Sequence, residues 1–152
     1  MPSAERALDD ARARGLAVEV VPRPPARSLE EAAAGLGIEP RLLVKTLVVR
    51  RGEDDYLFVL LPGDRQISWP KLRALVGANR LSMPDAELAR AATAYERGTI
   101  TPLGSSTAWP VFADERISGR IALGSGERDH AVFVDAAQLC AAYSAVVADL
   151  SA

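Results

Sequence analysis

The pattern of apolar and polar residues predicts short helices and short strands that follow one another along the chain. Strands are predicted where β-branched and aliphatic residues run together, and helices where apolar residues recur every three or four positions. Strands and helices do not alternate with a regular period, which favours a mixed α+β fold over a doubly wound parallel sheet. The predicted helices cover residues 3–14, 28–34, 68–76, 84–91 and 135–143, and the predicted strands cover residues 16–21, 41–50, 56–61, 80–82, 111–114, 119–123 and 131–134.

Local signals at the ends of these segments support the assignment. Ser28 followed by Glu31 has the form of a capping box, and Asp135 stands where a helix N-cap is expected. The polar residues 52–55 lie between two apolar runs and predict a hairpin that joins strands 41–50 and 56–61. No internal repeat and no low-complexity linker separates parts of the chain, so we expect one domain over residues 1–152.

The predicted strand 41–50 carries a lysine in an unusual place. Read with a period of two, both faces of the strand are apolar, yet Lys45 stands in the middle of the run. A lysine ammonium group is almost never fully buried without a partner. Lys45 therefore either extends past the strand end into solvent or lines a pocket and meets an anion there. The residues alone leave both interpretations open.

Composition and charge limit the classes of function. The chain has 152 residues, 49% hydrophobic and 25% charged, with a net charge of -2, as in an ordinary globular protein. No overall positive field draws it to nucleic acid, so such contacts need a local basic patch. No signal peptide and no membrane-spanning segment is expected. One cysteine, Cys140, and one histidine, His130, are too few for a zinc site, and a single thiol fits a reducing cytosol.

Two glycine-containing segments are candidates for ligand contact. Residues 98–104 combine two glycines, two threonines and a proline, which suits either a plain turn or a pocket wall where backbone approaches a substrate. This segment is not a phosphate-binding P-loop, because no Gly-Lys-Ser/Thr follows it. Gly124, Ser125 and Gly126 favour a simple hairpin turn, and the alternative is a nest of backbone N–H groups that binds an anion.

Taken in order, these segments resemble a known family. The run Val44-Lys45-Thr46-Leu47-Val48, the loop Gly98-Thr99-Ile100-Thr101-Pro102-Leu103-Gly104 and the turn Gly124-Ser125-Gly126 resemble the YbaK/ProX family, the freestanding relatives of the editing domain of bacterial prolyl-tRNA synthetase. The resemblance extends from about Leu16 to the end of the sequence. It implies an α+β fold with a mixed, mostly antiparallel sheet or partial barrel flanked by short helices.

The resemblance also implies a function and a set of site residues. Members of the family hydrolyse the ester between a wrong amino acid and the terminal adenosine of a tRNA, in the cytoplasm, with no cofactor and no metal. Mischarged tRNA is the implied partner, with prolyl-tRNA synthetase as a second one. The implied catalytic residues are Lys45, Gly98 and His130; the implied substrate-binding residues are Thr46, Thr99, Ile100, Thr101, Pro102, Gly124, Ser125 and Gly126; and Arg23, Arg27 and Arg80 are the expected tRNA contacts.

The implied chemistry is reasonable without a catalytic triad, because an aminoacyl ester is already activated and positioning with oxyanion stabilisation can suffice. Alanine on tRNA-Pro is the first choice of substrate, ahead of cysteine, serine, threonine and 2-aminobutyrate. Two other classes stay open. One is a non-catalytic module of the same fold that binds tRNA or the synthetase, and the other is a hydrolase of small-molecule esters or nucleotides.

Overall fold

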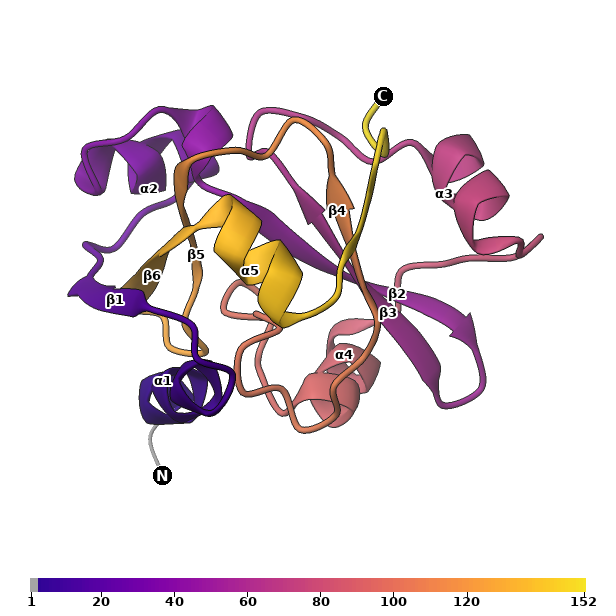
Figure 1. Cartoon of the computed structure of the whole chain (residues 1–152), viewed down its shortest axis with the longest axis horizontal. Coiled ribbons are helices and arrows are strands. Elements are labelled where there is room, and N and C mark those ends of the chain that lie inside the picture. The colour runs from indigo at the N-terminus through magenta and orange to yellow at the C-terminus, as the bar shows by residue number, and fades with distance from the viewer. Residues whose placement is uncertain (1–2) are drawn as a thin grey trace.

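The computed structural model describes residues 3–152, and Met1 and Pro2 lie outside the described residues. Short helices surround two small sheets, with α5 lying across them in the view of Figure 1. The helices are α1 (Ser3–Ala13), α2 (Leu29–Gly35), the 3-10 helix η1 (Pro40–Leu42), α3 (Trp69–Val76), α4 (Ala86–Thr93) and α5 (Ala136–Ala142). The strands are β1 (Val18–Pro22), β2 (Lys45–Gly52), β3 (Asp55–Leu61), β4 (Val111–Asp114), β5 (Arg120–Gly124), β6 (His130–Asp135) and β7 (Val146–Ala148).

The smaller sheet has the strand order β1-β6-β5, and both of its pairs are antiparallel. β5 and β6 form a hairpin, and the turn between them holds the predicted Gly124–Gly126 segment. β1 comes from the start of the chain and pairs with β6 near its end, with Val18 opposite Val134. The sequence places this strand at residues 16–21, and the structure shifts it toward Pro22, whose lack of an N–H is tolerated on an edge strand.

The larger sheet has the order β2-β3-β4-β7. β2 and β3 form the predicted hairpin, whereas β4 and β7 are parallel additions. A single bridge between Leu43 and Ala122 joins the two sheets, and the described strands do not close into a barrel. The expected α+β class with a mixed sheet is confirmed. β7 is not predicted by the sequence pattern, and the predicted strand 80–82 is reduced to one bridge from Ser82 to Arg50.

Both faces of the larger sheet are covered, which explains the apolar run of β3. On the inner face, Phe58 and Leu60 pack with Val44 and Val48 of the β2 segment against the smaller sheet. On the outer face, residues of β3 pack with Leu72 of α3 in a second cluster. A third cluster joins α2 to the junction between the two sheets. A strand buried on both faces reads as a continuous hydrophobic run rather than an alternating one.

The helix ends follow the capping signals in the sequence. The side chains of Ser28, Ser68, Asp85 and Asp135 each accept a hydrogen bond from the backbone N–H three residues later. The sequence assigns residues 84 and 85 to the fourth helix, but Asp85 is its N-cap, so α4 begins at Ala86. Between residues 3 and 152, each helix is too short or too polar to cross a membrane.

Asp114, at the end of β4, fastens the C-terminal segment to the larger sheet. Its side chain is fully buried and accepts hydrogen bonds from the backbone N–H of Leu150, at 2.9 Å, and of Arg116, at 3.0 Å. Burial alone raises the pKa of this carboxyl, but these hydrogen bonds outweigh burial and leave the pKa below its ordinary value of 3.8. The folded state therefore holds Asp114 ionised.

We expect Asp114→Asn to lower the free energy of unfolding by about 1–3 kcal/mol at neutral pH, because buried N–H donors lose a charged acceptor. The carboxylate contribution is full above the ordinary pKa of 3.8 and is lost as pH falls through the lowered pKa of the folded state. The difference in the free energy of unfolding between the variant and wild type should therefore decrease as the pH falls. Urea titrations between pH 2 and 7 measure this difference. Exposed Glu115→Gln is the matched control, and an equal loss in both variants would contradict the role of Asp114.

Candidate functional site

A pocket of about 550 Å³ opens where the first residues of β2 meet α2, the loop before residue 101 and the β5–β6 hairpin. Its apolar wall comes from the inner side of the larger sheet and from the elements facing it. The structure brings seven of the predicted site residues to this wall. They are Arg23, Arg27, Lys45, Thr46, Gly98, Ile100 and Gly124.

Lys45 lies at the start of β2, opposite Leu61 of β3, and lines the pocket. It is half-buried, and its Nζ donates a hydrogen bond to the backbone carbonyl of Arg65. An ammonium group has three protons, so this bond leaves donors for a ligand. Burial lowers the pKa of Lys45, while the negative charges of Asp64 and Glu30 act in the opposite direction. The pocket interpretation of Lys45 therefore has a geometric basis.

The turn after β3 holds the partner of Lys45 in place. Gly63 is buried in this turn, and a Cβ atom there would lie 2.5 Å from the carbonyl oxygen of Leu43 and would also collide with that of Pro40. Only glycine permits so close an approach of two backbone segments. The turn consequently folds back over the start of β2 and brings the Arg65 carbonyl to the lysine Nζ.

Thr46, the next residue of β2, places an unsatisfied hydroxyl in the same wall. Its Oγ1 is buried and has no hydrogen-bond partner among residues 3–152. A buried hydroxyl without a partner is costly, so such a group in a pocket wall is well suited to bind a polar group of a ligand. Thr46 and Lys45 both line the cavity, and as consecutive residues of β2 their side chains leave the strand on opposite faces.

The loop 98–104 contributes backbone rather than polar side chains to the pocket. Gly98 and Ile100 line the pocket, and Gly98 has a φ of 91°, in the region that favours glycine. Thr99 and Thr101 are buried and serve the loop itself. The Thr99 hydroxyl donates to the carbonyl of Glu96, and Thr101 Oγ1 accepts from the N–H of Leu103. Their direct contact with substrate, like that of buried Pro102, remains a prediction from the sequence.

The β5–β6 hairpin is attached to this loop through backbone groups. The N–H of Gly126 donates to the carbonyl of Thr99 at 2.9 Å. At Gly124 a Cβ atom would lie 2.8 Å from the carbonyl oxygen of Ile100, so the two segments are in close contact. Buried Ser125 donates to the carbonyl of His130 and thus stabilises the turn. The two glycine-containing segments therefore form one continuous pocket wall.

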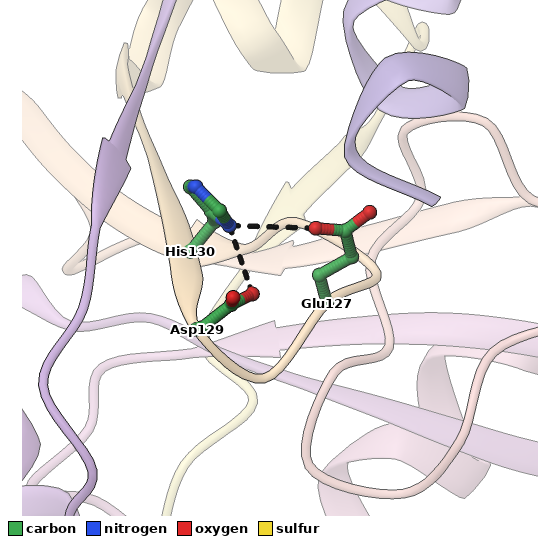
Figure 2. A group of neighbouring side chains, drawn as sticks. All are labelled: Glu127, Asp129 and His130. Carbon is green, nitrogen blue, oxygen red and sulfur yellow. Dashed lines mark hydrogen bonds and ion pairs between the residues drawn. The ribbon is translucent and has the colours of Figure 1, made fainter. Parts of the chain in front are cut away.

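His130, at the start of β6, contacts two carboxylates of the β5–β6 turn. Figure 2 shows its Nδ1 turned toward two carboxylates, at 2.9 Å from Asp129 Oδ1 and 3.4 Å from Glu127 Oε2. His130 is absent from the described lining of the pocket. In Glu127, Asp129 and His130, the structure gathers oxygen and nitrogen atoms within 4.8 Å of one another, an arrangement that could hold a metal ion and that sequence spacing did not reveal.

Arginines surround the pocket, and two of them were not singled out in the sequence. Arg97 and Arg128 line the pocket together with Arg23 and Arg27. Arg23 is fixed by hydrogen bonds from its guanidinium group to the carbonyl of Arg128. Among the described residues, Arg27 and Arg97 have no carboxylate within ion-pair distance, whereas Arg80 is exposed and does not line the pocket. The position of Arg97 directly before Gly98 is the sequence feature that could have identified it as a pocket residue.

Comparison with known proteins gives the family. Residues 23–141 match the model of the aminoacyl-tRNA editing domain. The chain belongs to this family.

The relatives of this editing domain include much longer proteins. Over 109 residues it is 37% identical to a proline–tRNA ligase of Nitratidesulfovibrio vulgaris strain DP4, an alignment that covers 71% of this chain and 19% of the ligase. Over 99 residues it is 35% identical to the proline–tRNA ligase of Thermosipho melanesiensis, covering 65% of this chain and 17% of that one. The editing domain thus spans about a fifth of the length of the curated relatives it matches.

A solved structure extends the comparison to the whole fold. A protein described as a candidate trans-editing enzyme for prolyl tRNA synthetase superposes with a TM-score of 0.91 and 29% sequence identity. The superposition covers 100% of this chain and 98% of the other, so the likeness extends to α1 and β7, beyond the residues that match the family model. The resemblance that the motifs indicate is confirmed.

Titration of Lys45 tests the electrostatics of the pocket directly. We expect the pKa of Lys45 to lie below its ordinary value of 10.5, because desolvation disfavours the charged form. Asp64→Asn should lower this pKa further, since it removes an opposite charge. The chain has only two lysines, so lysine Cε resonances followed by NMR measure it, and Lys71→Arg assigns the signals. A Lys45 pKa at or above 10.5 would contradict the half-buried placement.

Proposed function

We propose that this chain is a deacylase that removes a wrongly attached small amino acid from tRNA. The observation that carries the proposal is a half-buried lysine on the wall of an apolar pocket of about 550 Å³, with arginines at its edge. Membership in the aminoacyl-tRNA editing domain family supports the reaction class. As a trans-editing enzyme this chain would act in the cytoplasm, and residues 1–152 would form one domain.

The choice of tRNA rests on the relatives. Two of them are proline–tRNA ligases, and a close structural neighbour is described as a candidate trans-editing enzyme for prolyl tRNA synthetase. These names support tRNA-Pro as the substrate and prolyl-tRNA synthetase as a partner. The acceptor end of the tRNA would lie at the pocket mouth, where phosphates meet Arg23, Arg27, Arg97 and Arg128.

The amino acid is chosen by size. Side chains such as Val48, Leu123 and Ala131 give the pocket an apolar wall, against which we expect the side chain of the amino acid to pack. A hydrophobic pocket separates amino acids that differ by one methylene by only about 1–3 kcal/mol. Alanine is therefore our first choice, and esters of cysteine, serine, threonine and 2-aminobutyrate are weaker candidates.

In the proposed reaction, water attacks the ester carbonyl carbon, and the bond between that carbon and the ribose oxygen breaks. The ribose oxygen takes up a proton, so the products are a free amino acid and a tRNA with an intact terminal hydroxyl. Lys45 binds the terminal phosphate or polarises the ester carbonyl with the Nζ protons not used by Arg65. Thr46 Oγ1 and the backbone around Gly98 orient the ester.

Two other functions remain alternatives. A non-catalytic module that binds tRNA or the synthetase would keep the fold and the arginines but would not need a lysine in the pocket. A hydrolase of small-molecule esters or nucleotides would use the same pocket without the arginines at its edge. The experiments below distinguish both alternatives from tRNA deacylation.

Deacylation of tRNA-Pro charged with alanine, cysteine, serine, threonine or proline tests the proposal. We expect fast loss of one small non-cognate amino acid, with alanine first, and little loss of proline. Lys45→Ala should lower the rate about 100-fold or more, as removal of a charge-stabilising group does in other enzymes. Lys71→Ala, at the only other lysine, is the matched control and should retain activity.

The outcome separates the alternatives. If the protein binds tRNA but hydrolyses none of the esters faster than buffer alone, the deacylase proposal is wrong and the binding module is favoured. Hydrolysis of free aminoacyl esters at the same efficiency as aminoacyl-tRNA would favour the small-molecule hydrolase. Equal rates for wild type and Lys45→Ala would remove Lys45 from the mechanism while leaving the activity itself established.

The arginines at the pocket edge should govern tRNA affinity. We expect Arg97→Ala to weaken binding of tRNA-Pro and to reduce the slope of log K against log salt by about one, because one phosphate contact is lost. Arg80→Ala is the matched comparison: Arg80 is exposed and lies outside the described pocket lining, so we expect a smaller change. Filter binding at several salt concentrations measures both. If Arg80→Ala weakens tRNA binding more than Arg97→Ala does, the tRNA binds to another face of the protein.

A further inference from the structure

Helix α1 lies outside the residues that match the family model, yet it contacts both segments of the pocket wall. The match begins at residue 23, whereas α1 spans Ser3–Ala13. Ala7 and Ala11 are fully buried in the main core, which fixes one face of the helix. In Figure 1 the helix lies beside the smaller sheet, below the ends of β5 and β6. Its polar side chains are thereby brought to the loop 98–104.

Two side chains one turn apart on α1 bind both backbone groups of Gly104. Asp10 Oδ2 accepts a hydrogen bond from the N–H of Gly104 at 2.9 Å, and Arg6 Nη2 donates to its carbonyl at 2.6 Å. Residues four apart lie on one face of a helix, so this spacing suits the binding of both backbone groups of a single residue. The guanidinium group of Arg6 also lies 5.0 Å from the ring centre of Tyr95, whose hydroxyl donates to the carbonyl of Leu103.

Gly104 itself is shaped for this contact. Its φ is 71°, and a Cβ atom there would lie 2.7 Å from the backbone carbonyl of Arg6 and 2.6 Å from the hydroxyl of Tyr95. The backbone of the loop therefore rests directly against the backbone of α1. A contact this close transmits a shift of the helix to the loop, because the two backbones have no space to slide independently.

The other segment of the pocket wall is bound at the beginning of the same helix. The N–H of Ala4 donates to Glu127 Oε1 at 3.2 Å, and a carboxylate is favourable near a helix N-terminus. Gly126, next to Glu127, donates to the carbonyl of Thr99 in the loop. Helix, loop and hairpin therefore form a closed ring of contacts around one side of the pocket.

Within this ring of contacts between helix, loop and hairpin, Asp10 makes several of the hydrogen bonds. Besides Gly104, it accepts a hydrogen bond from the hydroxyl of Tyr143 at 2.5 Å and pairs with Arg14 at 3.0 Å. Tyr143 stands just after α5, also beyond the residues that match the family model. Asp10 thus joins two parts of the chain outside the matched region to the loop inside it.

We propose that α1 positions the pocket wall and that Asp10 is a positioning residue, which acts on the substrate through Gly104 and the loop that ends there. The proposal rests on the proposed deacylase function for its effect on rate. The geometry of Gly98 and Ile100 in the pocket then depends on a helix that the matched domain does not include.

The test uses the full chain and four variants. Asp10→Ala removes the acceptor, and Asp10→Asn keeps one acceptor oxygen at the same position. Tyr143→Phe removes a different hydrogen bond of Asp10 and leaves the contact with Gly104. Asp9→Ala, at the exposed neighbouring aspartate, is the matched control on the helix.

Two readouts are measured well below the melting temperature of every variant: amide hydrogen exchange of residues 98–104, and kcat and KM for deacylation of alanyl-tRNA-Pro. For Asp10→Ala we expect about tenfold faster exchange at Gly104 and about tenfold lower kcat, with tRNA affinity unchanged because the arginines are intact. Compared with Asp10→Ala, Asp10→Asn should restore part of the protection from exchange at Gly104 and part of kcat. Tyr143→Phe should lower the melting temperature but keep kcat and the exchange of the loop.

The results separate positioning from a merely structural role. If Asp10→Ala and Tyr143→Phe lose activity in proportion to their loss of stability, Asp10 only fastens the fold and the proposal is overturned. If exchange at Gly104 is the same in Asp10→Ala and Asp9→Ala, α1 does not set the loop, and the proposal is likewise overturned. If wild type deacylates no ester, the proposed function fails, while the exchange data still decide whether α1 holds the loop.

Discussion

The burial of β2 and β3 on both faces is the constraint that determines the character of the site. Val48 and Phe58 pack into the core between the sheets, and Val49 and Leu57 pack beneath α3 on the other face. A polar residue in the buried part of this pair of strands has no solvated face to occupy. Lys45 is tolerated because it is the first residue of β2, where it lines a pocket and its Nζ donates a hydrogen bond to a backbone carbonyl. The same burial that forms the core thus lowers the pKa of the lysine.

The pocket wall around this lysine is built mostly from backbone. Gly63 brings a turn against the segment that precedes β2, and Gly124 brings the hairpin against the loop at Ile100. Polar side chains in these segments, such as Thr99 and Ser125, bind neighbouring backbone groups. Such an arrangement fixes the shape of a site through main-chain contacts. The polar side chains of the wall, beside the arginines, are those of Lys45, Thr46 and Ser28, and Ser28 caps α2. A site of this kind suits a reaction that needs positioning more than proton transfer.

The parts of the fold that local chemistry controls could be predicted from the sequence. Ser28 and Asp135 cap helices as expected, because capping depends on residues within one turn. The hairpin of β2 and β3 was evident for the same reason. By contrast, β7 has only three residues and pairs in parallel with β4, a contact that no local pattern reveals. Arg128 reaches the pocket, and His130 meets Glu127, only because of how the hairpin turns, so sequence spacing could not distinguish their roles.

The pairing of β1 with β6 has a consequence for how the chain folds. Val18 and Val134 face each other across the smaller sheet although they stand near opposite ends of the sequence. Closing so long a loop costs entropy before the contact stabilises anything, and domains rich in such contacts fold slowly. Until the two strands pair, β6 presents an unpaired edge with Val132 and Val134, the kind of surface that pairs with other chains. The pairing of β1 with β6 therefore protects this edge from association with other chains.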